Sequence, residues 1–221
     1  IECKTLDVGS YQDILAEKIQ NMHETARLSC VFGGGHELTY GHFAGIRKAF
    51  PDKRIGVVNF DSHFDNRPLT KGITSGTGFR QIAENDSNYQ VLAIGIQPCA
   101  NTISLFEFAN SSNTDYITGQ NFDSCFDAEI SQKIEEFIES VDVLYVTICL
   151  DVFSSAYAPG VSAPIGIGIA PNGFFLRKLK MFTSHSKFKA FDVAELNPQF
   201  DVDFRTARFA ANLIFEVVNS N

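Results

Sequence analysis

The chain has 221 residues, which is long enough for one domain with a buried core and short for two. Its net charge of −8 argues against a nucleic-acid-binding surface, and it has no apolar run long enough to span a membrane. The five cysteines (3, 30, 99, 125 and 149) include no C-x-x-C pair, which predicts reduced thiols in a cytoplasmic protein. The chain starts at Ile1 without a signal-peptide pattern, so we expect a single domain that lacks an N-terminal portion.

Short apolar runs alternate with amphipathic stretches along the chain. In chain order they predict a helix at 11–22, a strand at 28–32, a helix at 37–50, a strand at 54–60, a polar loop to 77, a strand at 89–95, a helix at 102–109, a strand at 114–117, a helix around 130–138, and strands at 142–150 and 187–195. A last helix carries an apolar side formed by Ala207, Ala210, Ala211, Ile214, Val217 and Val218. Strands that alternate with helices predict an α/β protein with a parallel sheet covered on both faces.

The segment Asp61-Ser62-His63-Phe64-Asp65 directly follows the strand predicted at 54–60. Side chains alternate along an extended segment, so Asp61, His63 and Asp65 point the same way. Carboxylate and imidazole groups suit manganese, iron or zinc better than a metal that prefers thiolates. A solvated polar loop is the alternative interpretation of this segment.

Three other predicted strands lead into side chains of the same kind. His36 follows three glycines after the first strand, and Asp151 and Glu195 follow the last two strands. An ionised carboxylate at the end of an apolar strand is unfavourable unless it is paired or bound to metal. Because ligands bind at the carboxyl ends of parallel strands, these side chains predict one shared site. Ordinary polar or core roles are expected for the remaining histidines, His23, His42 and His185.

Four segments resemble, in order, the signatures of the arginase/agmatinase/formimidoylglutamase family: GGGHE, NFDSHFD, ICLDVFSSAYAPGVSAP and DVAELNP. They span residues 33–198, so the resemblance covers most of the chain. It implies a three-layer α/β sandwich around a mostly parallel sheet, with two Mn²⁺ ions at the strand ends. Members of the family extend further at the N-terminus, in agreement with the missing start expected above.

Carried over residue by residue, the resemblance implies the metal ligands His36, Asp61, His63, Asp65, Cys149 and Asp151. Asp61 would bridge the two ions. The family has a second bridging aspartate where this chain has Cys149. Because manganese prefers oxygen ligands, this departure implies one labile ion or an oxidation-sensitive site.

A second departure from the family pattern narrows the expected activity. Arginases and agmatinases have a histidine in the loop after the D-x-H-x-D motif, where this chain has Ser75. This segment resembles that of the formimidoylglutamase branch. The residues Asn101-Thr102 and the segment APGVSAP resemble that branch as well. The resemblance therefore implies hydrolysis of N-formimidoyl-L-glutamate to L-glutamate and formamide, a step of histidine degradation.

The resemblance also implies roles around the substrate. Asp65 would orient the attacking hydroxide, and Glu195 would pair with the protonated formimino nitrogen. The glutamate end of the substrate brings two carboxylates, which match the planar fork of arginine, although surface salt bridges are the alternative for each arginine. The expected substrate-binding residues are Arg67, Ser75, Thr77, Arg80 and Glu195. Packing or subunit contacts in a homo-oligomer are expected for two further arginines, Arg205 and Arg208.

Two other functions stay open at this stage. A ureohydrolase of the agmatinase or arginase type would release urea from a guanidino substrate, and its cationic substrate would favour an acidic outer pocket. A catalytically silent homologue would bind metal and act in an assembly, an interpretation that Cys149 and Ser75 favour. Metal content measured together with turnover separates the silent homologue from both enzymes.

Overall fold

The computed structural model describes residues 7–124 and 127–220, and these form a six-stranded sheet. Every pair of neighbouring strands is parallel. The strands lie in the order β1 (Ser29–Phe32), β6 (Phe188–Ala194), β5 (Val143–Cys149), β2 (Ile55–Phe60), β3 (Tyr89–Ile96) and β4 (Thr114–Thr118). The strands predicted from apolar runs are thereby confirmed, each within two residues at either end.

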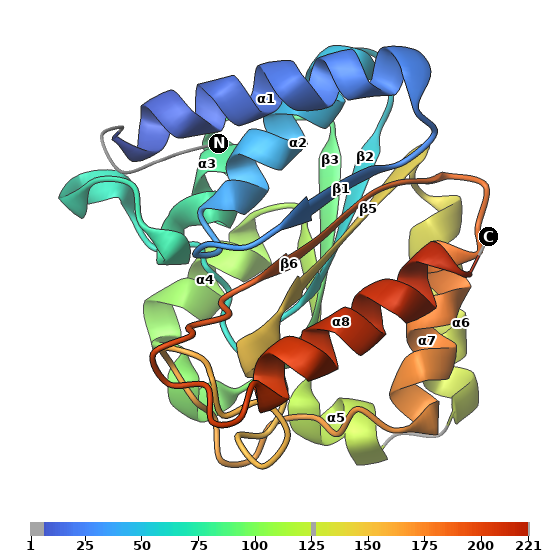
Figure 1. Cartoon of the computed structure of the whole chain (residues 1–221). Coiled ribbons are helices and arrows are strands. Elements are labelled where there is room, and N and C mark those ends of the chain that lie inside the picture. The colour runs from blue at the N-terminus through green and yellow to red at the C-terminus, as the bar shows by residue number, and fades with distance from the viewer. Residues whose placement is uncertain (1–6, 125–126, 221) are drawn as a thin grey trace.

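Helices cover both faces of this sheet (Figure 1). One face packs against α1 (Val8–Thr25), α2 (Leu38–Ala49), α3 (Gly78–Asn85) and α4 (Ile103–Ser111). The other packs against α5 (Gly119–Ser124), α6 (Asp127–Glu139), α7 (Gly173–Thr183) and α8 (Arg205–Val218). Two hydrophobic clusters, one on each face, make the three-layer α/β sandwich that the sequence predicted.

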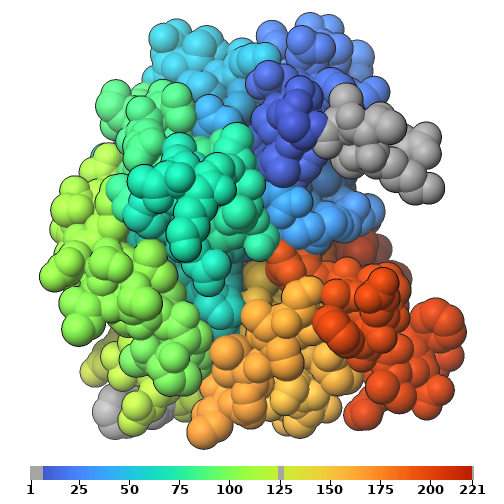
Figure 2. Space-filling view, turned by 90° about the vertical axis from the view of Figure 1, so that its left-hand side faces the viewer, coloured from blue at the N-terminus to red at the C-terminus, as the bar shows by residue number. Residues whose placement is uncertain are grey.

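The strand order places a topological switch point between β2 and β5. From β2 the chain continues outward through β3 and β4, whereas β5 returns to the other side of β2 and is followed by β6. The loops that follow β2 and β5 therefore run to opposite faces, and in open α/β sheets this is the position at which ligands bind. Figure 2 shows this side of the molecule, with the segment after β2 in teal beside the loop after β5 in orange. Ser62 Oγ joins the two segments by donating to Asp151 O at 2.9 Å.

Some helices differ from the sequence prediction. Helices α3, α5 and α7 were not predicted. Helices α3 and α5 are short and have few apolar residues, whereas α7 carries Phe175, Leu179 and Phe182 at helical spacing, a signal that was overlooked. The apolar side predicted for the last helix is confirmed in part. Ala210 and Val217 are buried and Ala207 and Ile214 are half-buried, but Ala211 and Val218 are exposed, and α8 also buries Thr206 and Leu213. None of the helices in the described ranges is long and apolar enough to cross a membrane.

The three cysteines that the structure describes, Cys30, Cys99 and Cys149, carry free thiols. Their burial differs, since Cys149 is buried, Cys30 is half-buried and Cys99 is exposed. The other two cysteines of the sequence, Cys3 and Cys125, lie outside the described residues.

Candidate metal centre

The metal ligands predicted from the sequence gather beyond the carboxyl ends of β2 and β5. Asp61 and His63 follow β2, Cys149 ends β5 and Asp151 follows it, and His36 lies in the loop between β1 and α2. Three glycines precede His36, and two of them, Gly33 and Gly34, have φ angles of +109° and +69°. Glycine adopts these left-handed conformations without strain, so the chain can turn back over the sheet edge here. The same loop is tied to the end of β6, because Glu195 N donates to Gly34 O at 2.9 Å.

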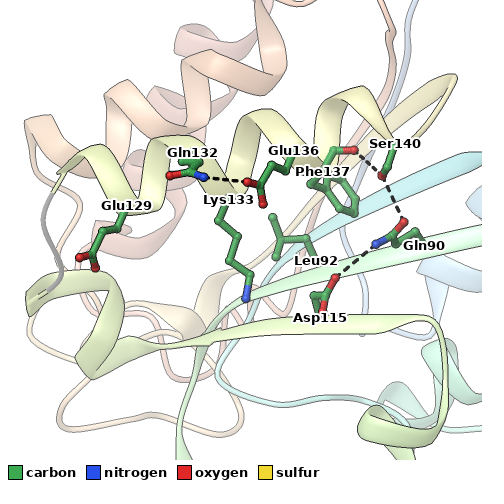
Figure 3. Close-up of a pocket in the computed structure, with 9 residues that line it drawn as sticks. All are labelled: Gln90, Leu92, Asp115, Glu129, Gln132, Lys133, Glu136, Phe137 and Ser140. Carbon is green, nitrogen blue, oxygen red and sulfur yellow. Dashed lines mark hydrogen bonds between the residues drawn. The ribbon is translucent and has the colours of Figure 1, made fainter.

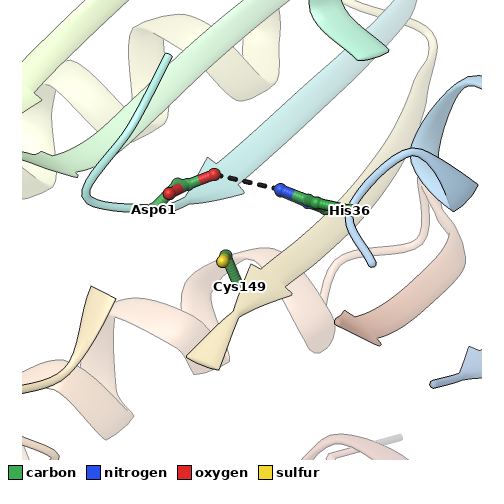
Figure 4. Close-up of side chains that lie close together, drawn as sticks. All are labelled: His36, Asp61 and Cys149. Carbon is green, nitrogen blue, oxygen red and sulfur yellow. Dashed lines mark ion pairs between the residues drawn. The ribbon is translucent and has the colours of Figure 1, made fainter. Parts of the chain in front are cut away.

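Two groups of potential ligands share one carboxylate. The first consists of His36, Asp61 and Cys149, and the second of Asp61, His63 and Asp151, with the ligand atoms of each group within 4.8 Å of one another. Figure 4 shows the first group, with the Cys149 sulfur below the line that joins Asp61 to His36.

The two oxygens of Asp61 face different histidines. Oδ2 lies 3.0 Å from His36 Nδ1, and Oδ1 lies 3.5 Å from His63 Nδ1. A carboxylate placed in this way can bridge two cations, one on each side. The arrangement therefore matches the bridging role that the resemblance implied for Asp61.

Asp65 and Glu195 both contact His36 and extend the cluster. Asp65 Oδ2 lies 2.9 Å from His36 Nδ1, and Glu195 Oε1 accepts a hydrogen bond of 2.8 Å from the backbone N–H of His36. Both residues have left-handed backbone conformations, with φ of +46° and +69° respectively. Such strain in residues other than glycine is concentrated at functional sites, where the surrounding structure maintains it.

The buried charges shift the pKa values of the two histidines. Burial alone would lower the pKa of His63, but hydrogen bonds and charge interactions with Asp151 and Asp61 raise it to about 11. The pKa of His36 is raised well above its usual value in the same way, because Asp61 and Asp65 outweigh the effect of burial.

The pKa values of the carboxyl groups in the cluster shift in opposite directions. Burial and the charge of Asp61 raise the pKa of both Asp65 and Asp151 to about 6. Burial also favours the neutral form of Asp61, but hydrogen bonds with His36 and His63 lower its pKa below the usual range. The two histidines thus favour the ionised form of Asp61, which belongs to both ligand groups.

The donor set fits divalent cations. Asp151 Oδ1 is buried and has no hydrogen-bond partner among the described residues, which is unfavourable unless a cation or water meets it. Carboxylate oxygens and imidazole nitrogens suit manganese. Cys149 departs from this chemistry, because burial and the charges of Asp151 and Asp61 raise the pKa of its thiol well above the usual value and disfavour a thiolate ligand.

The predicted substrate-binding residues occupy different environments. Arg67 and Ser75 are exposed, and Arg67 is in no ion pair with the residues that the structure describes. Thr77 is buried, and its hydroxyl donates to Thr74 O at 2.8 Å to close a helical turn. The Arg80 guanidinium stacks on the Phe108 ring at 3.3 Å from its centroid. Arg67 and Ser75 therefore have side chains available to a ligand, whereas Thr77 and Arg80 have internal partners.

Sequence reasoning missed a set of buried polar residues behind the cluster. Thr147 Oγ1 lies 2.8 Å from His36 Nε2 and donates to Asp192 Oδ1 at 2.5 Å. His42, expected to be an ordinary residue, is fully buried and places Nδ1 2.8 Å from Asp192 Oδ2. One signal was available, because Tyr145, Thr147 and Cys149 alternate with apolar residues along β5.

A groove beside α6 is not part of this site. It has a volume of about 510 Å³ and lies between α6 and the first half of β3 and β4. Figure 3 shows that its polar side chains bind one another: Gln90 donates to Asp115 at 3.2 Å and accepts from Ser140 at 3.1 Å. Gln90 is the second residue of β3, so the groove lies toward the amino end of that strand and away from the cluster.

Fold and cluster together define the class of this protein: a parallel α/β protein with a candidate two-cation centre at its switch point. Residues 1–219 match the arginase family, and the chain belongs to that family. The predicted resemblance and fold are thereby confirmed.

Two curated relatives are named formimidoylglutamase. The one from Macrococcus caseolyticus is 39% identical over 214 residues, which cover 97% of this chain and 67% of the relative. The one from Staphylococcus carnosus is 40% identical over 208 residues, covering 94% of this chain and 67% of the relative. The chain thus spans about two thirds of the length of these relatives.

Solved structures show the same fold at lower sequence identity. Formimidoylglutamase from Bacillus subtilis has a TM-score of 0.90 at 18% identity. The match covers 100% of this chain and 70% of the formimidoylglutamase. A variant of Trypanosoma cruzi formiminoglutamase with Mn²⁺ has a TM-score of 0.86 at 22% identity, with 98% of this chain and 72% of that one covered. Arginase from Bacillus cereus has a TM-score of 0.82 at 20% identity, and the match covers 95% of this chain and 77% of the arginase.

Proposed function

We propose that this chain hydrolyses N-formimidoyl-L-glutamate to L-glutamate and formamide with two Mn²⁺ ions. The observation that carries the hydrolase assignment is the buried Asp61 carboxylate, whose two oxygens face two histidines at the switch point. Two relatives named formimidoylglutamase, 39% and 40% identical, support the choice of substrate within the arginase family.

The residues that would hold the ions are His36, Asp61, His63, Asp65, Cys149 and Asp151. Cations bound there would lower the pKa of a water molecule from ~15.7 toward neutrality and so supply a nucleophile for an amidine-like carbon. The remaining tasks, which are binding, orientation and proton transfer, fall to side chains around the cluster.

Asp65 and Glu195 are placed to act on the reacting groups. Burial and then the charge of Asp61 raise the pKa of Asp65 to about 6 when no cation is bound. Asp65 would orient the attacking water, and either Asp65 or solvent would pass a proton to the leaving amine, since Ser75 is a poor acid. Glu195 is held by the backbone N–H of His36 and would pair with the protonated formimino nitrogen, which fixes the carbon for attack.

The glutamate end of the substrate needs a cation, and Arg67 is the better candidate. Arg67 is exposed two residues after Asp65, and its side chain packs over Gly76. Arg80 is stacked on Phe108 and donates to Asn66 O at 3.2 Å. An arginine without an internal partner can offer both arms of its guanidinium to a carboxylate. We therefore assign the main carboxylate contact to Arg67.

The test is a substrate panel with protein reconstituted with Mn²⁺. Formimidoylglutamate should yield formamide and glutamate in equal amounts, measured by chromatography. Agmatine and arginine are the comparison substrates, and urea release from either without formamide would contradict the assignment. Uptake of two Mn²⁺ ions without turnover of any of the three substrates would identify a silent metal-binding homologue instead.

A further inference from the structure

A chain of buried polar side chains runs from the candidate metal centre into the space between α2 and the sheet. His36 Nε2 lies 2.8 Å from Thr147 Oγ1, which lies 2.5 Å from Asp192 Oδ1. Asp192 Oδ2 in turn meets His42 Nδ1 at 2.8 Å and accepts the hydroxyl of Tyr145. All five residues are at most 1% exposed, so water does not supply these hydrogen bonds.

The number of available hydrogens determines the direction of each bond in this chain. An ionised carboxylate only accepts, so Thr147 must donate its single hydroxyl hydrogen to Asp192. Thr147 Oγ1 can then only accept from His36, which requires a hydrogen on His36 Nε2. The other ring nitrogen of His36, Nδ1, is the one that faces Asp61 and Asp65 at 3.0 and 2.9 Å. A hydrogen fixed on Nε2 thus leaves Nδ1 as the nitrogen that can bind a metal.

The surroundings of Asp192 hold its carboxyl group in place through hydrogen bonds to both oxygens. Burial and the charge of Asp192 raise the pKa of Tyr145 well above its usual value, so the phenol keeps its hydrogen and donates it. His42 Nδ1 supplies a second donor from α2, and His42 Nε2 lies 2.9 Å from Ser29 Oγ on β1. A buried carboxylate with three donors is satisfied, whereas an unpaired one would destabilise the sheet.

We propose that Asp192 is a positioning residue that acts through Thr147 to hold His36 with Nε2 protonated and Nδ1 free to bind a cation. The proposal rests on the metal-ligand role that the proposed function gives to His36. Hydrogen bonds from a second layer of residues orient histidine ligands and raise their basicity, and their loss weakens metal binding. Asp192, Thr147 and His42 would therefore determine the affinity of one of the two cation sites.

The first test compares two substitutions of Thr147. Thr147→Val keeps the shape but removes the hydroxyl, and we expect Mn²⁺ affinity at one of two sites to fall about 10- to 100-fold. Thr147→Ser keeps the hydroxyl and should restore affinity close to that of the wild type. Thr183→Val is the matched control, because Thr183 is also fully buried and its hydroxyl has no partner among the described residues. The readout is titration with Mn²⁺ alone, with free Mn²⁺ measured by electron paramagnetic resonance.

The second test asks whether Asp192 acts through Thr147. Asp192→Asn should weaken the same site, and the double variant with Thr147→Val should bind no more weakly than Thr147→Val alone. Additive losses would show that Asp192 acts independently and would overturn the relay. Circular dichroism checks folding, and Asp192→Asn alone carries the test if Thr147→Val does not fold, with unchanged affinity overturning the proposal.

The outcomes separate this proposal from the proposed function. Unchanged Mn²⁺ affinity in Thr147→Val contradicts the positioning role only, since turnover of the substrate is not measured. Wild-type protein that takes up no Mn²⁺ would overturn both proposals. Loss of affinity in Thr147→Val with recovery in Thr147→Ser supports the relay whichever substrate the protein hydrolyses.

Discussion

The two faces of β5 and β6 have different compositions although both are buried. Toward α6, α7 and α8 the strands present Val146, Ile148, Phe191 and Val193, all in one apolar cluster. Toward α1 and α2 they present Tyr145, Thr147 and Asp192, which bind one another and the histidines of the neighbouring loop and helix. Apolar burial stabilises the fold through contact area, whereas buried polar groups are stable only with specific partners. One face therefore holds the sheet together, and the other positions the cluster.

Removing Asp61 should have the largest effect on the polar face. Asp61→Ala deletes the carboxylate shared by both ligand groups, so we expect both Mn²⁺ ions to be lost and activity to fall on the order of 1000-fold or more. Metal content by atomic emission and turnover of formimidoylglutamate measure the two effects. A fully active Asp61→Ala protein would refute the bridging role.

A substitution on the apolar face should lower stability and leave Mn²⁺ affinity unchanged. Ile148 is fully buried in the cluster under α6 to α8, and Ile148→Ala should lower the free energy of unfolding by about 2–5 kcal/mol. The Mn²⁺ affinity of the folded protein should stay unchanged, because Ile148 points away from the ligands. Urea denaturation and Mn²⁺ titration are the measurements. A drop in affinity as large as that of Thr147→Val would remove the distinction between the faces.

The contrast between the faces also explains what the sequence could and could not predict. Strand ends were predictable, because Asp61 and Asp151 follow apolar runs and parallel strands end at one edge. The pairing of Thr147 with Asp192 depends on the register of β5 against β6, which local patterns do not encode for residues 45 positions apart. His42 was underestimated for the same reason, since its partner lies 150 residues away. Helix α7, by contrast, could have been predicted, because Phe175, Leu179 and Phe182 lie at helical spacing and are buried.

Substrate recognition should depend on a residue outside both packed faces. Arg67→Ala should raise KM for formimidoylglutamate about 10- to 100-fold with little change in kcat, as expected for a charge-assisted hydrogen bond of about 1.5–3 kcal/mol. Arg177→Ala is the control, because Arg177 is an exposed arginine on α7 that pairs with Asp127. Steady-state kinetics measure both variants. An unchanged KM in Arg67→Ala would indicate that Arg80, rather than Arg67, contacts the carboxylate.

Substitution of Cys149 should have the smallest effect on activity. Whether activity rises or falls tests the chemistry of the polar face. Cys149→Asp replaces a thiol, whose pKa burial and nearby carboxylates raise, with an oxygen ligand that manganese prefers. We expect activity at saturating Mn²⁺ to be preserved or raised. Without metal the same substitution adds a carboxyl group beside Asp61 and Asp151, so the chelator-treated variant should be less stable than the wild type.

Thermal unfolding of Cys149→Asp with chelator and with Mn²⁺ separates these two contributions. A cation that binds only the folded state stabilises it more as its affinity rises, so the shift in Tm caused by Mn²⁺ should be larger in Cys149→Asp than in the wild type. Cys149→Ser controls for the loss of sulfur without adding a charge. An equal or smaller shift would show that position 149 does not contact a cation, and the metal centre would then consist of His36, Asp61, His63, Asp65 and Asp151 alone.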